Sequence, residues 1–121
     1  MKEGDKLYVI TRRDLSPGRQ AAQSCHALRA FVQDWPEIDQ EWYETSNYLV
    51  LLSVKDEKEL RDLFHRAREI GLRGSWFLEP DLNNQITAIA LEPGNRTSDF
   101  CAHLPLTLSE LCTVPIKSST T

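Results

Sequence analysis

The sequence predicts one α/β domain, in which a mixed β-sheet is layered with helices in the order β-α-α-β-α-β-β-α. Short apolar segments alternate with longer segments of helical periodicity, which is typical of a layered sheet. A short turn separates the last two apolar segments, so these strands must pair antiparallel. The length of 121 residues fits a single domain. We predict that this domain spans residues 1–112, followed by a frayed polar tail at 113–121.

The first strand and the first helix are predicted from local signals. Residues 6–11 (KLYVIT) are short, apolar and β-branched, which indicates a buried strand. Ser16 followed by Pro17 marks a helix start, with serine as the N-cap and proline as the first helical residue. The helix should end at Asp34, because Pro36 disfavours helical geometry at the residue before it.

The middle of the chain contains a short helix, a strand and a longer helix. Residues 37–45 form the short acidic helix. Residues 47–54 (NYLVLLSV) are almost continuously apolar, which predicts a strand buried on both faces of the sheet. The spacing of Asp56 and Glu59 is that of a capping box, and Gly71 closes the helix that follows.

The last part of the chain predicts two strands and a final helical turn. Residues 75–78 and 86–91 read as strands, separated by a turn at residues 80–85 (PDLNNQ). A last helical turn is expected at residues 98–103. An extended segment that packs back on the domain is indicated by the alternation of Leu104, Leu106 and Leu108.

Composition excludes several classes of protein. With 40% hydrophobic and 26% charged residues, the chain is neither disordered nor fibrous. No apolar run approaches the ~18 residues of a membrane span, and the N-terminus has no secretory pattern, so we expect a cytoplasmic protein without membrane contact. Cys25, Cys101 and Cys112 form no C-x-x-C pair, which indicates neither a zinc site nor a disulfide framework. We expect no metal and no cofactor.

Positive charge is unevenly distributed along this acidic chain of net charge -4. Between residues 12 and 29 the only acidic residue is Asp14, whereas residues 34–44 contain acids and no base. The acidic run is expected to be solvated surface. A local cationic patch is predicted by the arginines of the first segment, which are Arg12, Arg13, Arg19 and Arg29.

The first helix has two distinct faces at ~100° per residue. The predicted core face consists of Ala21, Cys25, Leu28 and Val32. On this interpretation Cys25 is a buried, inert thiol.

The opposite face combines Arg19, Gln23 and His26 at positions i, i+4 and i+7. Their neighbours Ala22 and Ala30 are small, so a ligand or a backbone can approach closely. Arg19 lies in the first turn, where free backbone N–H groups already favour an anion such as phosphate. Two alternatives stay open: the face is an ordinary solvated one, and His26 is a structural histidine packed beside the sheet.

One motif on this helix is similar to that of a known family. Arg13-Asp14-Leu15, Gly18, Ala21-Ala22-Gln23 and His26-Ala27 follow a short apolar strand and resemble the opening motif of the type 2 peptidyl-tRNA hydrolases. Weaker matches continue in order to Thr87 in the last strand, Pro93 and His103-Leu104, so that the resemblance covers about residues 6–108.

The resemblance implies a mixed four-stranded sheet flanked by helices on both faces. It also implies metal-independent hydrolysis of the ester that joins a peptide or N-blocked amino acid to the 3′ end of tRNA. The partner is then tRNA, and a homodimer is common in the family. The alternative is a non-catalytic RNA-binding or protein-interaction domain on the same fold.

The resemblance assigns the catalytic roles to Arg19, Asp81 and Thr87. Arg19 replaces the family's lysine; it cannot act as a base but can hold a phosphate or a developing oxyanion. The loop between the last two strands is several residues shorter than in the family, so either Asp81 or Glu79 supplies its carboxylate. Thr87 matches a threonine of the family's site. Substrate binding is expected of Arg12, Asp14, Gln23 and His26.

Overall fold

The computed structural model describes residues 1–109 and contains one mixed sheet in the order β2-β1-β4-β3. Strand β1 (Lys6–Arg12) is parallel to β2 (Tyr48–Val54) on one side and antiparallel to β4 (Gln85–Leu91) on the other. Strand β3 (Gly74–Glu79) pairs antiparallel with β4 and forms the second edge. The predicted mixed four-stranded sheet is therefore confirmed, with β1 and β4 at its centre.

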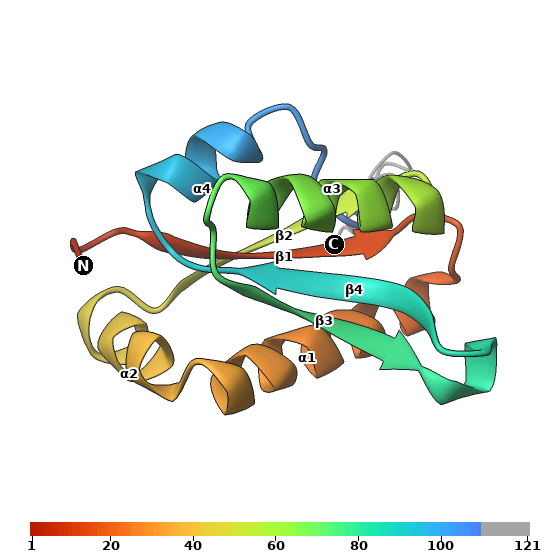
Figure 1. Ribbon diagram of the computed structural model, residues 1–121, viewed down its shortest axis with the longest axis horizontal. Helices are drawn as coiled ribbons and strands as arrows, with labels where there is room; N and C mark the ends of the chain where they lie inside the picture. The colour runs from red at the N-terminus through yellow and green to blue at the C-terminus, as the bar shows by residue number, and fades with distance from the viewer. Residues whose placement is uncertain (110–121) are drawn as a thin grey trace, which may run out of the picture.

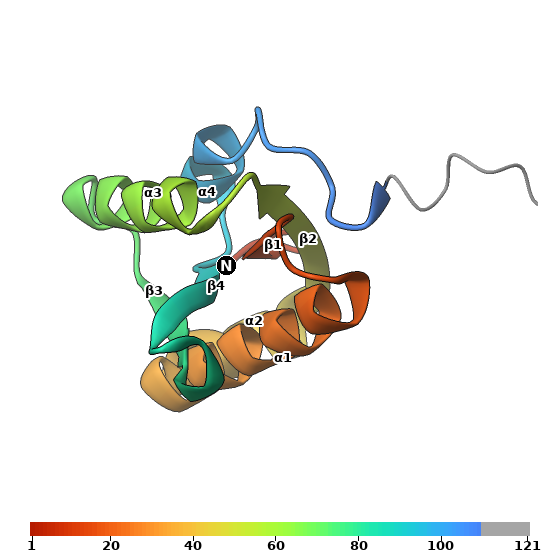
Figure 2. The same ribbon diagram turned by 90° about the vertical axis from the view of Figure 1, so that its right-hand side faces the viewer.

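Helices cover both faces of this sheet, as predicted (Figure 1). Helices α1 (Pro17–Asp34) and α2 (Pro36–Thr45) lie on one face, and α3 (Glu57–Glu69) and α4 (Asn95–Phe100) lie on the other. Figure 2 looks along the strands and shows the resulting three layers. Within the described residues, no helix is both long and apolar enough to cross a membrane.

Local signals fix where the long helices begin. The Ser16 side chain accepts a hydrogen bond from the Arg19 N–H, as expected of an N-cap before Pro17. At the start of α3, Asp56 accepts from the Glu59 N–H at 3.0 Å, and the Glu59 carboxylate accepts from the Lys55 N–H at 2.9 Å. Hydrogen bonds of this kind satisfy backbone N–H groups at and just before the start of a helix, which have no partner within the helix.

The last helix differs from its prediction. It spans Asn95–Phe100 instead of residues 98–103. Gly94 has φ 135°, a conformation open to glycine, and the helix starts directly after it. The predicted domain end at 112, Cys112 and the tail at 113–121 lie outside the described residues.

Two apolar clusters fill the space between the layers. Alternate residues of β1 and β4 point to opposite faces, so each strand contributes to both clusters. Between the sheet and α3, the fully buried side chains include Ile10, Leu60, Ile86 and Ile89. Between the sheet and α1, they include Leu7, Val9, Ala27 and Phe31.

The predicted core face of α1 was wrong in part: Leu28 is partly buried against the core, but Ala21 and Cys25 are exposed. The buried thiol is instead Cys101, where burial raises the pKa to about 12. Polar side chains reach the interior because they find partners there: Gln20 Nε2 donates to Leu15 O at 2.7 Å. The predicted core residues were Ala21, Cys25, Leu28 and Val32. The residues actually buried are Gln20, Gln23, Ser24, Ala27 and Phe31.

The prediction for β2 was also wrong in part. We predicted that β2 is buried on both faces of the sheet. Instead it is an edge strand, and the side chains of Tyr48 and Leu49 are 56% and 42% exposed. The second half of β2 is buried. There the segment at residues 105–107 runs beside it, with an antiparallel bridge between Leu52 and Leu106. The predicted return of the leucine-rich segment is thus confirmed.

Candidate active site

A polar hollow of about 150 Å³ lies between the start of α1 and the turn that joins β3 to β4. That turn contains a short 3-10 helix, Pro80–Leu82. The hollow brings together Arg19, Gln23 and Asp81, three residues predicted for the site from distant parts of the chain. Its complete lining is Leu15, Arg19, Gln23, Glu79, Asp81 and Leu82.

Gln23 connects the hollow to the sheet. Its Nε2 donates to Glu79 Oε1 at 2.7 Å, and its Oε1 accepts from the Thr87 hydroxyl at 2.5 Å. The carboxylate can only accept, so the orientation of the amide is determined by its partners. The side chain is only 7% exposed and is therefore held in one place.

Thr87 reaches Gln23 through an irregularity in the sheet. The β3–β4 register passes from Phe77 opposite Ala88 to Leu78 opposite Ile86, which leaves Thr87 as the extra residue of a bulge. Thr87 is fully buried. Its hydroxyl therefore lies behind Gln23, and it can influence a substrate only through that amide.

Glu79 is the carboxylate that the structure holds in place. Its second oxygen accepts the backbone N–H of Asp81 at 3.2 Å. The hydrogen bond from Gln23, followed by that from the Asp81 N–H, lowers the pKa of Glu79, and the nearby Arg19 guanidinium acts in the same direction. Glu79 is thus an anion at neutral pH, whereas the Asp81 side chain lies exposed at the rim. The sequence left the choice between these two residues open.

Arg19 and His26 occupy different places around the hollow. Arg19 is exposed in the first turn of α1, and within residues 1–109 its guanidinium forms no ion pair. His26 does not line the hollow; its ring stacks on Phe77 with centroids 4.6 Å apart. This contact agrees with the alternative stated above, in which His26 is a structural residue packed beside the sheet.

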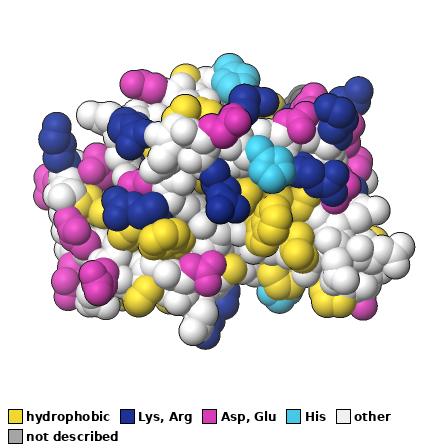
Figure 3. Space-filling model, in the orientation of Figure 1, with side chains coloured by type: hydrophobic (Ala, Val, Ile, Leu, Met, Phe, Trp, Pro, Cys, Tyr) yellow, Lys and Arg dark blue, Asp and Glu magenta, His cyan; other side chains and the backbone are white. Residues whose placement is uncertain are grey.

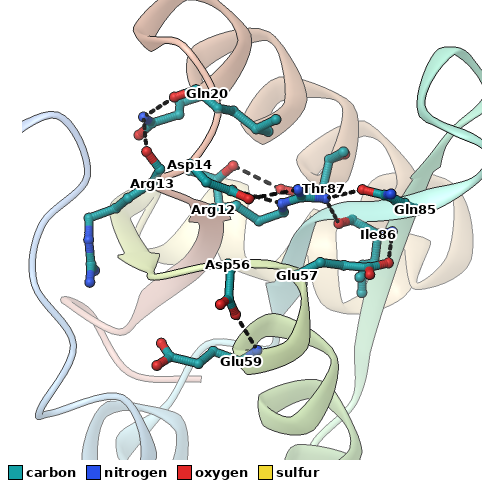
Figure 4. Close-up of polar contacts among 12 residues, drawn as sticks. Arg12, Arg13, Asp14, Gln20, Asp56, Glu57, Glu59, Gln85, Ile86 and Thr87 are labelled. Carbon is teal, nitrogen blue, oxygen red and sulfur yellow. Dashed lines mark hydrogen bonds and ion pairs between the residues drawn. The ribbon is translucent and has the colours of Figure 1, made fainter.

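Arg12 and Asp14 are not part of the lining of the hollow. They form a bonded framework between β1 and β4 (Figure 4). Two guanidinium nitrogens of Arg12 each donate to Asp14 at 2.9 Å, and the third donates to Gln85 Oε1 at 2.9 Å and Ile86 O at 3.1 Å. The ion pair raises the pKa of Arg12 and lowers that of Asp14. It ties the end of β1 to the start of β4. Arg13 points the other way, toward Ser53.

Sequence reasoning missed Leu15, Leu82 and Gln85. Leu15 belongs to the motif after β1, so the motif itself was a usable signal. Leu82 and Gln85 lie in a turn-forming run without any pattern of their own, and only the folded turn places them here.

Fold and site together define a class: a small α/β protein with a preorganised polar site that combines a carboxylate, an amide and a free guanidinium. Such a site suits the hydrolysis or binding of an anionic ester. Comparison with known proteins is consistent with this class. A sequence profile of the family described as Peptidyl-tRNA hydrolase PTH2 matches residues 5–106. The chain belongs to this family.

Two similar proteins are named peptidyl-tRNA hydrolase. The one from Methanocaldococcus jannaschii is 34% identical, over 84% of this chain and 98% of its own length. The one from Aeropyrum pernix is 29% identical, over 95% of this chain and 96% of its own length. A solved structure of a protein of unknown function from Agrobacterium tumefaciens has a TM-score of 0.61 at 17% identity. It covers 84% of this chain and 96% of its own, and this likeness concerns the fold alone.

Proposed function

We propose that this chain hydrolyses the ester between a peptidyl or N-blocked aminoacyl group and the 3′ end of tRNA, at the hollow beside α1. The observation that carries the assignment is the contact of 2.7 Å between Gln23 and Glu79, which fixes a carboxylate beside Arg19. Family membership and the names of both relatives favour hydrolysis over a non-catalytic binding domain.

Glu79 acts as the carboxylate that orients the attacking water. Two hydrogen bonds hold it in place, and it is ionised at neutral pH, so it can orient the attacking water and take up its proton. Its lowered pKa makes it a weaker base, so positioning of the water is its main contribution. Asp81 remains the alternative, since it lines the same hollow. Its exposed side chain is less restrained, which favours Glu79 for a step that depends on position.

Arg19 supplies fixed positive charge. A guanidinium does not lose its proton near neutral pH, so it cannot be the base. It can hold a tRNA phosphate, or it can stabilise the negative charge that develops on the carbonyl oxygen. The free backbone N–H groups at the start of α1 add to the same field.

Gln23 and Thr87 position the site. Thr87 holds Gln23, and Gln23 holds Glu79, so the chain of contacts passes from the buried sheet to the hollow. Arg12 and Asp14 support the β1–α1 loop from behind. His26 lies outside the hollow and stacks on Phe77, so its role in substrate binding is confined to the part of the substrate that passes along α1.

The setting of the reaction follows from the family. A cytoplasmic location belongs to this proposal, because the proposed substrate is made during translation. The homodimer that the resemblance implies belongs to the same proposal, and sedimentation equilibrium of the purified chain measures it. A purely monomeric chain at the concentrations of the activity assay would reject the dimer.

A single-turnover release assay tests the function. Folded protein in excess over N-acetyl-aminoacyl-tRNA, without added metal, is expected to release the N-acetyl amino acid. Release no faster than in buffer alone, together with retained binding of tRNA, would overturn the proposal and identify a binding domain.

A further inference from the structure

The outer edge of β3 is open and begins at the candidate active site. β3 is the last strand of the sheet, and among the described residues no strand pairs with its outer side. Its final residue is Glu79, the partner of Gln23. An open edge presents unpaired backbone N–H and C=O groups that can bind another extended chain. A chain leaving the hollow along this edge therefore passes all of β3.

Two common forms of edge protection, lysine and proline, are missing here. The strand GSWFLE has no lysine and no proline, and its only charged residue is Glu79, at the site end. Trp76 and Leu78 are 39% and 38% exposed beside the edge. Trp76 stacks on Phe64 with ring centroids 5.1 Å apart, so it is a rigid contact surface. Figure 3 shows this face, with hydrophobic side chains below basic (Lys or Arg) and His side chains.

A second hollow, of about 430 Å³, lies at the other end of β3. Its walls include Trp35, Phe64 and Trp76, and Trp35 Nε1 donates to Gly74 O at 3.0 Å. A strand of this length covers roughly 20 Å at about 3.3 Å per residue. The bond from Trp35 already occupies the Gly74 carbonyl, so the open part of the edge runs from Glu79 back to Ser75 and ends at this aromatic hollow.

We propose that the outer edge of β3 binds the peptidyl part of the substrate as an added β-strand. This inference rests on the proposed function, because the peptide is attached to the ester. The ester is at the C-terminal end of the peptide and must lie near Glu79. The peptide therefore runs parallel to β3, with its N-terminal part toward the hollow at Trp35.

Strand addition fits the chemistry of this substrate. Main-chain hydrogen bonds are independent of sequence, as an enzyme that accepts many different peptides requires. Trp76 and Leu78 add apolar contact at alternate side chains of the peptide. An RNA strand fits this edge less well, because the two arginines that line its aromatic hollow are already engaged: Arg73 pairs with Glu92, and Arg68 lies over the Phe64 ring.

The first test is a length series. The kcat/KM is measured for N-acetyl-aminoacyl-tRNA and for peptidyl-tRNAs of increasing length. We expect it to rise up to about six residues, the length of β3, and then to level off. Equal values at all lengths would overturn strand addition alone, because hydrolysis of the short substrate would still support the proposed function. If even the short substrate is not hydrolysed, the proposed function itself fails.

The second test changes only the substrate. An edge-added strand directs the N–H and C=O groups of every second residue at β3. N-methylation at successive peptide positions should therefore lower kcat/KM about 3- to 10-fold at alternate positions and leave the others unchanged. Absence of this period of two would overturn the proposal.

The third test compares W76A with Y48A, which truncates an exposed aromatic residue on the opposite edge strand. W76A should lower kcat/KM for a six-residue peptidyl-tRNA and not for N-acetyl-aminoacyl-tRNA, and Y48A should change neither. An equal loss on both substrates would show that the edge contacts the tRNA and would overturn the proposal. L78A provides the same comparison if a thermal melt shows that W76A is unfolded.

Discussion

At the scale of single residues, Gln23 organises the hollow because both ends of its amide are engaged. One end fixes a carboxylate and the other is fixed by a buried hydroxyl. Rotation of the side chain would break both bonds and leave Thr87 and Glu79 without this partner. This mutual dependence distinguishes Glu79 from Asp81, whose side chain lies free at the rim.

We predict that E79Q lowers kcat by roughly 100-fold or more, since general acid–base groups typically contribute that much. Glutamine keeps the size of the side chain and can still accept a bond from Gln23, so the loss reports the charge. The matched variant D81N should reduce kcat by much less. Single-turnover rates of both variants decide between them; a large loss in D81N with normal turnover in E79Q would reverse the assignment.

For Arg19, two roles predict different results. If it contacts a phosphate, R19A weakens tRNA binding and reduces the salt slope by roughly one unit. If it stabilises the oxyanion, kcat falls ~100-fold or more with the salt slope unchanged. R19K retains the positive charge but loses the two parallel N–H donors of the guanidinium, so we expect it to keep part of the function that R19A loses. A large rate gain of R19K at alkaline pH would show instead that lysine supplies a base. Wild-type behaviour of both variants would remove Arg19 from the site.

At the scale of elements, α1 packs on the sheet through a stripe that is partly polar. Phe31 and Ala27 supply its apolar part, and Gln20, Gln23 and Ser24 supply the rest. Each polar member bonds to a neighbouring segment or to the helix itself, so its burial is compensated. The helix can therefore present the Gln23 amide to the hollow from its packed face.

We predict that F31A lowers the free energy of unfolding by about 3–5 kcal/mol, because it removes a fully buried ring. C25A, on the exposed side of the same helix, should change it by less than about 0.5 kcal/mol. Urea denaturation of both variants measures the difference. Equal destabilisation would contradict the orientation of α1 described above.

At the scale of the whole molecule, the pair of Arg12 and Asp14 joins the central strands next to the site. The pKa of Asp14 is lowered in the fold, mainly by its hydrogen bond with Arg12. A lowered carboxyl pKa contributes stability that is present above the unfolded value, near 3.9, and is lost as pH falls through the folded value.

We therefore predict that D14N destabilises the protein at pH 7 by roughly 1–2 kcal/mol. This lies below the range for fully buried pairs, since the Asp14 side chain is 41% exposed. The difference from wild type should shrink below about pH 4, where the wild-type carboxyl also becomes protonated. Urea titrations at pH 7 and near pH 3 test this, and a difference that does not vary with pH would contradict it.

Much of the fold was predictable because its signals are local. Ser16 with Pro17, Pro36, and Asp56 with Glu59 mark helix boundaries through bonds or clashes within a few residues. Strand identity follows from short apolar runs in the same way. The predicted position of the last helix was wrong, because the start of this helix depends on the backbone angle of Gly94, which the sequence does not show.

The sequence by itself determined the order of strands and helices along the chain. It also determined the family motif that runs into α1, and Arg19 and Gln23 as candidates for the site. Only the tertiary structure decided which face of α1 is buried and that Glu79 is the restrained carboxylate. The reason is that a buried polar side chain is stable only with a partner. The partners of Gln23 come from β3 and β4, far along the chain. Periodicity records whether a residue is polar, but only the fold shows whether its partner is within reach.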